Sequence, residues 1–218
     1  MPRRNLERVN HLPYLVTVNG NNREPFAFDI TKFWQIIGNE CLFLTLAYEV
    51  EFHAVVLMPN HIQMILTVPS HDLGIITREL LKSISKRANL ISGRSGHIFS
   101  GPYRWSLINN PRYFGHILKF IYQSPTRAGL CHLVEEYPYS TLHGLIGGCR
   151  LPFPLYLTRV GLEQVLPSPE TGLQLEWLNQ PFPSEAEILI KKALRQKFIE
   201  VVIDRKTRKP SDLLTRLI

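Results

Sequence analysis

Residues 52–68 read FHAVVLMPNHIQMILTV, and this stretch decides the fold. Two apolar, β-branched runs, 52–57 and 61–68, lie on either side of Met58-Pro59-Asn60. Each run has the length and composition of a strand. Proline and asparagine between them are typical of a turn, because proline fixes φ and asparagine tolerates turn backbone. The stretch therefore predicts a β-hairpin.

The segments on both sides of the hairpin predict further strands and helices. Apolar residues at helical spacing follow Asp29, a residue type that caps helices, and an amphipathic pattern runs over 73–90. Pro111 favours the start of another helix, which a Ser-Pro pair ends. With strands at 13–18 and 103–108, the order is β-α-β-β-α-β-α. This order predicts an α+β, ferredoxin-like fold with a central, mainly antiparallel sheet, helices packed on it and a C-terminal extension.

The chain is expected to divide into one main domain and two shorter parts. Residues 1–148 hold the predicted strands and helices and form the main domain. Residues 149–183 are expected to be a wrap or linker, because six prolines fall in the 33 positions up to residue 183. Residues 184–218 are expected to be a basic helical tail, whose helix opens on a capping box of Ser184 and Glu187.

The composition excludes several classes of protein. The chain has 218 residues, of which 44% are hydrophobic and 20% charged, and this is typical of a globular protein. It contains no apolar run of roughly 20 residues, the length that a membrane-spanning helix needs. Three widely spaced cysteines argue against a disulfide framework or a zinc site, and the N-terminus has no secretory signal. We expect a cytoplasmic protein that contacts no membrane.

The net charge of +7 is unevenly distributed along the chain. It is −1 over residues 1–69, +7 over 70–130, −5 over 131–190 and +6 over 191–218. Two basic blocks separated by an acidic one are typical of a protein that binds a polyanion, because phosphates release counterions when Lys and Arg approach. The alternative is that these charges are solvated helix faces. We expect a polyanion such as a nucleic acid as the partner.

The first basic block contains candidate DNA-binding residues. A stripe on the helix predicted over 73–90 consists of Arg78, Lys82, Lys86 and Arg87. The strand predicted over 103–108 adds Arg104 and Trp105, which suggest phosphate pairing and base stacking. The alternatives are a solvated stripe and a Trp105 that belongs to the core.

Several ordered motifs resemble one family, the REP-associated tyrosine transposases of the HUH endonuclease superfamily. The hairpin is similar to the family's V-L-M-P-N-H-x-H, and Ser95–Gly101 is similar to S-G-H-x-[WF]-Q-x. Phe120–Leu130 resembles Y-I-x-x-N-P-V-R-A-G-L, and Arg127 in this motif is expected to contact DNA. The resemblance covers about residues 12–145. It implies an HUH fold that binds single-stranded or hairpin DNA and cleaves it through a 5′-phosphotyrosine link, with a divalent metal held by paired histidines.

The chain departs from the family pattern at each position that carries this chemistry. His61 matches the first histidine, but Gln63 stands at the second, so Mg²⁺ or Mn²⁺ binding is expected to be weakened. Phe120 stands at the nucleophilic tyrosine and has no hydroxyl to attack phosphorus. Ser124 replaces the asparagine before the proline and is a doubtful metal ligand because it is shorter.

Two neighbours of Phe120 are candidates for a substitute role. Tyr122 lies two residues on, which turns its side chain by about 200° along a helix, so it is expected to face away from the site. His116 lies one turn before Phe120 on the same face, where a ring nitrogen could ligate a metal or contact a phosphate.

These observations favour a transposase-like protein that binds single-stranded or hairpin DNA and has lost strand cleavage. One alternative is an active metal-dependent endonuclease or transposase that uses Tyr122 or a metal-activated water. Another is a repurposed protein-interaction module, with a homodimer or a protein partner bound through the tail. The DNA sequence recognised and the oligomeric state are not specified by these motifs.

Overall fold

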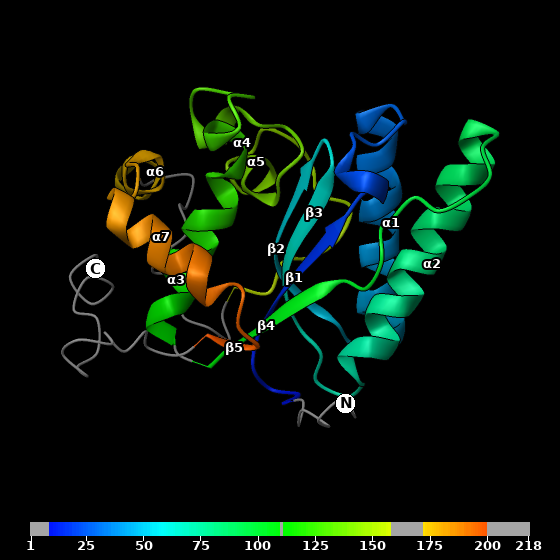
Figure 1. The fold of residues 1–218 in the computed structure, drawn as a ribbon, viewed down its shortest axis with the longest axis horizontal. Coiled ribbons are helices and arrows are strands. Elements are labelled where there is room, and N and C mark those ends of the chain that lie inside the picture. The colour runs from blue at the N-terminus through cyan, green and yellow to red at the C-terminus, as the bar shows by residue number, and fades with distance from the viewer. Residues whose placement is uncertain (1–8, 110, 158–171, 200–218) are drawn as a thin grey trace.

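A five-stranded sheet lies between two layers of helices in the computed structural model of the chain, which describes residues 9–109, 111–157 and 172–199 (Figure 1). The strands are β1 (Tyr14–Asn19), β2 (Glu51–Met58), β3 (His61–Thr67), β4 (Arg104–Ile108) and β5 (Phe198–Ile199). Their order is β2-β3-β1-β4-β5; the first four pair antiparallel, and β5 pairs parallel with β4. The predicted α+β fold with a mainly antiparallel sheet is confirmed.

The register of the sheet determines which polar side chains share a face. Thr17 of β1 pairs with Gln63 of β3 on one side and with Arg104 of β4 on the other. Directly paired residues on neighbouring strands point to the same face of a sheet. Gln63, Thr17 and Arg104 therefore form a row across three adjacent strands.

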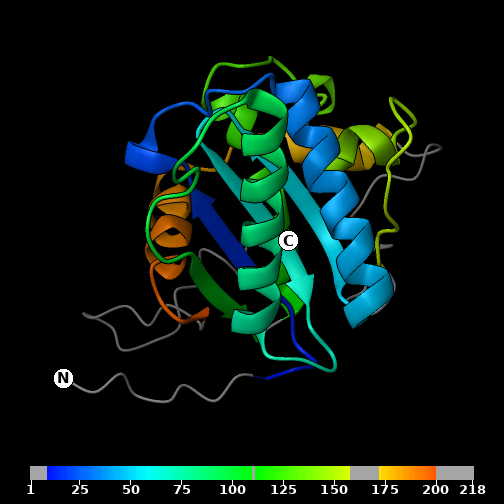
Figure 2. The ribbon, with the colours of Figure 1, turned by 90° about the vertical axis from the view of Figure 1, so that its right-hand side faces the viewer.

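One face of the sheet is covered by α1 (Ile30–Tyr48) and α2 (Leu73–Ser92), which Figure 2 shows lying across the front of the strands. Both helices begin where an aspartate caps free backbone N–H groups. The Asp29 carboxylate accepts a hydrogen bond from the Lys32 N–H at 2.8 Å, and that of Asp72 accepts one from the Gly74 N–H at 2.7 Å.

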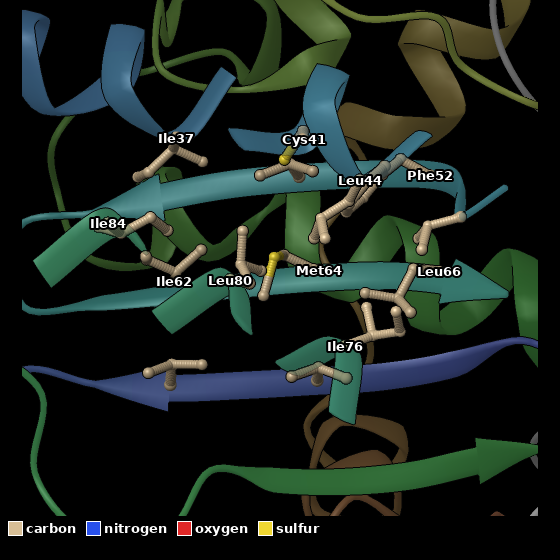
Figure 3. Packing of buried hydrophobic residues seen from close by; sticks show 14 of the residues in the cluster. Ile37, Cys41, Leu44, Phe52, Ile62, Met64, Leu66, Ile76, Leu80 and Ile84 are labelled. Atoms are coloured by element: carbon tan, nitrogen blue, oxygen red, sulfur yellow. The ribbon is translucent and has the colours of Figure 1, made fainter. Parts of the chain in front are cut away.

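The larger core lies between these two helices and the sheet. Figure 3 shows side chains of both helices reaching toward the strands. The labelled side chains are Ile37, Cys41 and Leu44 of α1, Ile76, Leu80 and Ile84 of α2, and Phe52, Ile62, Met64 and Leu66 of the strands. All ten are at most 1% exposed, so burial of this apolar area drives α1 and α2 onto the sheet.

The opposite face of the sheet carries α3 (Pro111–Tyr122) and the shorter elements that follow it. These are α4 (Ser124–Arg127), η2 (Val134–Glu136), α5 (Thr141–Leu145), α6 (Gly172–Asn179) and α7 (Ser184–Ala193); a further single turn, η1 (Asn21–Arg23), follows β1. Phe114, Leu118 and Ile121 of α3 pack with Leu15 of β1 and Ile65 of β3 in a second buried cluster. This face of the sheet carries the residues at which the family motifs depart.

Residues 150–157 leave α5 and pack against α1 and β2. The Phe153 ring meets the Phe52 ring edge-on, with centroids 5.5 Å apart, and the Tyr156 N–H donates to the Phe52 carbonyl at 2.9 Å. Pro152 approaches Gly38 so closely that a β-carbon at Gly38 would lie 2.3 Å from the Pro152 ring. Gly38 therefore permits this packing. The rest of the expected wrap up to residue 171 lies outside the described residues.

The structure differs from the sequence-based prediction at the C-terminal end. The capping box at Ser184 and Glu187 is wrong. Pro183 is the capping residue, and no side chain caps α7, because the proline side chain has no hydrogen-bond acceptor. The Glu187 carboxylate pairs with Arg127 and Lys191. The helix α6 lies within the segment expected to be a wrap or linker, and the strand β5 was not predicted. Residues 200–218 of the expected tail lie outside the described residues. In the ranges described, none of the helices combines the length and apolar character needed to cross a bilayer.

Candidate functional site

The two positions of the expected metal site lie at the start of β3. His61 follows the turn, and its Nδ1 lies 2.7 Å from Asn60 Oδ1. Burial lowers the pKa of His61, so its ring is neutral at neutral pH. Gln63, two residues on, points to the α3 side of the sheet, because Ile62 and Met64 belong to the core on the other side.

Gln63 is connected to the α3–α4 corner by one hydrogen bond. Ser124 Oγ donates to Gln63 Oε1 at 2.8 Å, and both side chains are buried. Ser124 is the first residue of α4, directly before Pro125, and the kink between α3 and α4 brings it over β3. The sequence-predicted positions Gln63, Phe120 and Ser124 are thus brought together in one place, which we call the Phe120 site.

Arg127 closes the Phe120 site. Its guanidinium carbon lies 3.9 Å from the centroid of the Phe120 ring, a cation–π distance. One guanidinium nitrogen donates to the Phe120 carbonyl at 2.7 Å and to Ser124 Oγ at 3.0 Å. A permanent positive charge therefore stands against the Phe120 ring.

Glu187 of α7 was missed as a site residue by the sequence analysis. Its Oε1 lies 3.8 Å from Arg127 Nε and 2.7 Å from Lys191 Nζ. Burial lowers the pKa of Arg127, and the negative charge of Glu187 raises it in opposition. The i, i+4 spacing of Glu187 and Lys191 indicates their pairing, but no local pattern indicates that α7 meets α4.

A divalent cation beside the Phe120 site would find few suitable donor atoms. His61 supplies one neutral nitrogen, and Gln63 an amide oxygen that already accepts from Ser124. The Glu187 carboxylate, which reaches Arg127, is paired with Arg127 and Lys191. Across the described ranges, His, Cys, Asp and Glu side chains do not form a cluster of three that could hold a metal ion. Hard divalent cations prefer several oxygen ligands with carboxylates among them, so the residues do not fit a tight site.

Tyr122 lies away from the Phe120 site. Its hydroxyl is 2.9 Å from Thr141 Oγ1 of α5, and the side chain is 1% exposed. Burial is the larger influence on the pKa of this phenol and raises it far above its usual value, while the hydrogen bond to Thr141 acts in the lowering direction. A phenol held neutral in this way is a poor nucleophile.

Lys119, one residue before Phe120, is buried between two aromatic rings. Its Nζ lies 4.6 Å from the Trp177 ring centroid and 5.0 Å from that of Phe182. These rings come from α6 and from the segment before α7, so Lys119 holds the C-terminal extension against α3. Desolvation lowers the pKa of Lys119 from 10.5 to about 8.

This lowered pKa makes the free energy of unfolding depend on pH. The unfolded chain binds the Lys119 proton up to pH 10.5 and the folded chain only up to about 8, so this group adds stability as pH rises between the two. We expect the unfolding free energy of the protein minus that of Lys119→Met to increase by about 1–2 kcal/mol from pH 8 to pH 10. Urea unfolding at both pH values measures it. Exposed Lys192→Met is the matched control, and a difference that stays flat would contradict the assignment.

The candidate DNA-binding residues do not share one surface. The stripe on α2 lies on the far side of the sheet from the Phe120 site (Figure 1). Arg78 and Lys82 of the stripe are largely exposed, whereas Arg87 Nε pairs with the buried Glu40 carboxylate of α1 at 2.5 Å. Arg104 is exposed at the start of β4, on the face of the sheet that carries Gln63.

Trp105 belongs to the core, which was the alternative to a base-stacking role. The side chain is 9% exposed, and its ring meets the Tyr14 ring edge-on at 5.6 Å. Lys197 Nζ lies 4.3 Å from the ring centroid. The ring is thus already packed within the protein.

His116 packs in the cluster between α3 and the C-terminal extension. Its ring is 3% exposed and lies edge-on to the Phe182 ring, with centroids 6.3 Å apart. It therefore belongs to the same packing as Lys119, beside the rings that hold the extension.

Comparisons with known proteins place this geometry in context. No protein-family model matches the chain. A protein of Haemophilus influenzae that carries the name REP-associated tyrosine transposase is 25% identical over 107 residues, which are 44% of this chain and 61% of that protein. The chain thus spans about three fifths of this relative's length. A solved structure of a REP-associated tyrosine transposase bound to a REP hairpin superimposes with a TM-score of 0.57 at 23% identity, over 71% of this chain and 89% of that one.

The sheet and its two helical layers are therefore those of a transposase-type α+β fold. Within that class, the resemblance of this chain to the REP-associated tyrosine transposases is confirmed, in sequence over part of its length and in fold over most of it.

Proposed function

We propose that this protein binds single-stranded or hairpin DNA as a transposase-like protein and has lost strand cleavage. The observation that carries the proposal is the Phe120 site, where the Phe120 ring lies against the Arg127 guanidinium. The resemblance assigns this position to the family's nucleophile. The fold is shared with a transposase whose structure holds a REP hairpin, which supports DNA as the partner. Association with the bacterial nucleoid is part of the same proposal.

The proposed loss of cleavage follows from the chemistry of two side chains, Phe120 and Gln63. Phe120 has no oxygen to form a bond to phosphorus, and loss of the nucleophile in unrelated hydrolases lowers turnover by on the order of 10⁶. Gln63 Oε1 accepts from Ser124, so it offers a metal less than a free ligand would. We propose that Mg²⁺ or Mn²⁺ binds weakly at His61 and Gln63.

The structure gives little support to an active enzyme that uses Tyr122. The Tyr122 hydroxyl is buried on Thr141, and reaching a phosphate would require α3 to rotate within the core. A metal-activated water would need the divalent ion that the donor set at His61 and Gln63 holds poorly. Loss of cleavage is therefore the better proposal.

The ion pairs of Glu187 partly support a second function, that of a protein-interaction module. An interaction module would bury the basic blocks against the acidic block, and Glu187 of that block does neutralise Arg127 and Lys191. The side chains of Arg78 and Lys82, however, are 70% and 74% exposed. The α2 stripe thus remains open to a partner, and we retain it as a second proposed contact for phosphates.

The proposal predicts binding without cleavage. We expect the protein to bind a labelled DNA hairpin with a single-stranded extension, and the affinity to fall steeply between 50 and 200 mM salt because phosphate contacts release counterions. With Mn²⁺ or Mg²⁺ present, a denaturing gel should show neither nicked DNA nor a covalent adduct. Indifference to the oligonucleotide at low salt would contradict DNA binding. An adduct that Tyr122→Phe abolishes would contradict the loss of cleavage.

A further inference from the structure

A cavity lies between the sheet and α7, outside the Phe120 site. It has a volume of about 210 Å³. Its polar lining consists of Thr17 and Asn19 of β1, Arg104 and Ser106 of β4, and Lys191 and Arg195 from α7 and the turn after it. A cavity of this volume has room for a phosphate group.

The cavity lies on the same face of the sheet as the Phe120 site. Gln63, Thr17 and Arg104 are direct cross-strand neighbours, and adjacent strands are about 4.8 Å apart. Arg104 is therefore about 10 Å from Gln63 along the row, two strand spacings away. Stacked nucleotides rise about 3.4 Å each, so a few nucleotides of one strand span this distance.

The charge of the cavity lining is positive. Arg104, Lys191 and Arg195 contribute three cations, and the lining includes no aspartate or glutamate. Lys191 is paired with Glu187, which also faces Arg127. The cationic groups at the Phe120 site and at the cavity are thus joined through one carboxylate, and Arg104 and Arg195 remain exposed.

The lining is held in place by the sheet. Ser106 Oγ lies 2.6 Å from the Gln196 carbonyl and 3.3 Å from that of Leu194, toward which it can donate. The Leu107 N–H donates to the Lys197 carbonyl at 2.8 Å, and Lys197 Nζ lies over the Trp105 ring. The turn that carries Arg195 is therefore fixed against β4, and the cavity is a built feature of the fold.

From this placement we infer that the cavity between β1, β4 and α7 binds a backbone phosphate of the single-stranded part of a bound DNA. The strand would pass from the Phe120 site over Thr17 to Arg104, with Arg104 and Arg195 as its main phosphate contacts. The Thr17 side chain lies on this path and the Asn19 side chain lines the cavity beside it, and both can donate hydrogen bonds to phosphate oxygens. The inference rests on the proposed function and adds where the single strand lies.

The test compares two double variants that remove the same charge. Arg104→Ala with Arg195→Ala removes two cations from the cavity. Lys32→Ala with Lys192→Ala removes two exposed cations outside its lining, one on α1 and one on α7. The probes are three forms of one DNA hairpin. One carries an eight-nucleotide single-stranded extension at its 5′ end, one carries it at its 3′ end, and one has a blunt end. Melting temperatures verify that both variants are folded.

We expect the cavity variant to lose about tenfold or more in affinity for an extended hairpin, and its salt slope to fall by about 0.7 for each lost single-strand phosphate contact. The control variant should lose markedly less, and the blunt hairpin should bind both variants alike. Equal affinity of the two variants for the extended hairpins would overturn the inference and leave the proposed function intact. A cavity variant that loses as much affinity for the blunt hairpin as for the extended hairpins would also overturn it, because the lost contact would then be to the duplex. A wild-type protein that binds none of the probes would overturn the proposed function itself.

Discussion

The double variant Phe120→Tyr, Gln63→His is expected to form a covalent adduct with a hairpin DNA that the wild-type protein binds without cutting. The substitutions return a phenol to the end of α3 and a second imidazole to the same face of β3. The phenol supplies the attacking oxygen, and two imidazoles at i and i+2 can hold one ion that polarises the phosphate. An adduct that withstands denaturing electrophoresis in the presence of Mn²⁺ is the measurement.

The single variants serve as controls for this prediction. Phe120→Tyr alone has the nucleophile but one imidazole, and loss of a supporting metal contact commonly costs 10–100-fold, so it should be slower than the double variant by at least that factor. Gln63→His alone should form no adduct, because it lacks a hydroxyl at position 120. Adding Tyr122→Phe to the double variant should leave cleavage unchanged.

A double variant that binds the hairpin normally and forms no adduct would contradict the hypothesis that only the side chains at positions 63 and 120 separate this site from an active one. Arg127 would then be the residue to examine, since its guanidinium lies against the ring at position 120 and donates to Ser124. Retained binding is what makes this result informative, because it shows that the variant is folded and competent for DNA.

The parts of the fold that follow from local sequence were predicted within a residue or two. The hairpin was predicted from 52–57 and 61–68 and observed as Glu51–Met58 and His61–Thr67, because its two apolar runs and its Pro-Asn turn agree. Helix α2 was predicted over 73–90 and ends at Ser92, where Gly93 with φ of 65° caps it. Glycine tolerates that left-handed backbone, so the end of the helix is a local signal.

The contacts that shape the candidate site are the ones that local pattern does not carry. Glu187 contacts Arg127, which lies 60 positions earlier in the sequence, and Lys119 contacts Trp177, which lies 58 positions later. Such pairs depend on how α6 and α7 fold back over α3, and neither an acidic residue of the tail helix nor an aromatic residue of the proline-rich region indicates its partner by local sequence. The same holds for β5, whose two residues are too few to show a period.

The charge pattern illustrates the difference between composition and placement. The basic block at 70–130 was expected to bind a polyanion, and the sheet separates the α2 stripe of this block from Arg104 and Arg127. The residue types define these charges but do not indicate the side of the sheet on which each residue lies. Only the register, which sets Arg104 in line with Thr17 and Gln63, shows which cation lies on the face of the Phe120 site.

Thr141→Val is expected to lower the free energy of unfolding by about 3–5 kcal/mol. This is the largest loss among the single substitutions at Thr141 and Tyr122. Thr141 Oγ1 accepts from the Val55 N–H at 3.0 Å, lies 3.3 Å from the Val55 carbonyl and 2.9 Å from the Tyr122 hydroxyl, and is buried. Valine has nearly the same shape but no oxygen. It leaves the Val55 N–H and the Tyr122 hydroxyl without their partner, at about 1–3 kcal/mol each.

Matched variants separate the hydroxyl from the methyl group. Thr141→Ser keeps the oxygen and should cost only about 1 kcal/mol for the lost methyl group. Tyr122→Phe should cost about 1 kcal/mol, and combined with Thr141→Val it should cost less than the sum, because one unpaired hydroxyl has been removed. Chemical unfolding of the wild type, Thr141→Val, Tyr122→Phe and the double variant gives the coupling. If Thr141→Val were as mild as Thr141→Ser, the hydroxyl of Tyr122 would not be held at Thr141, and the case against Tyr122 as a nucleophile would lose its structural basis.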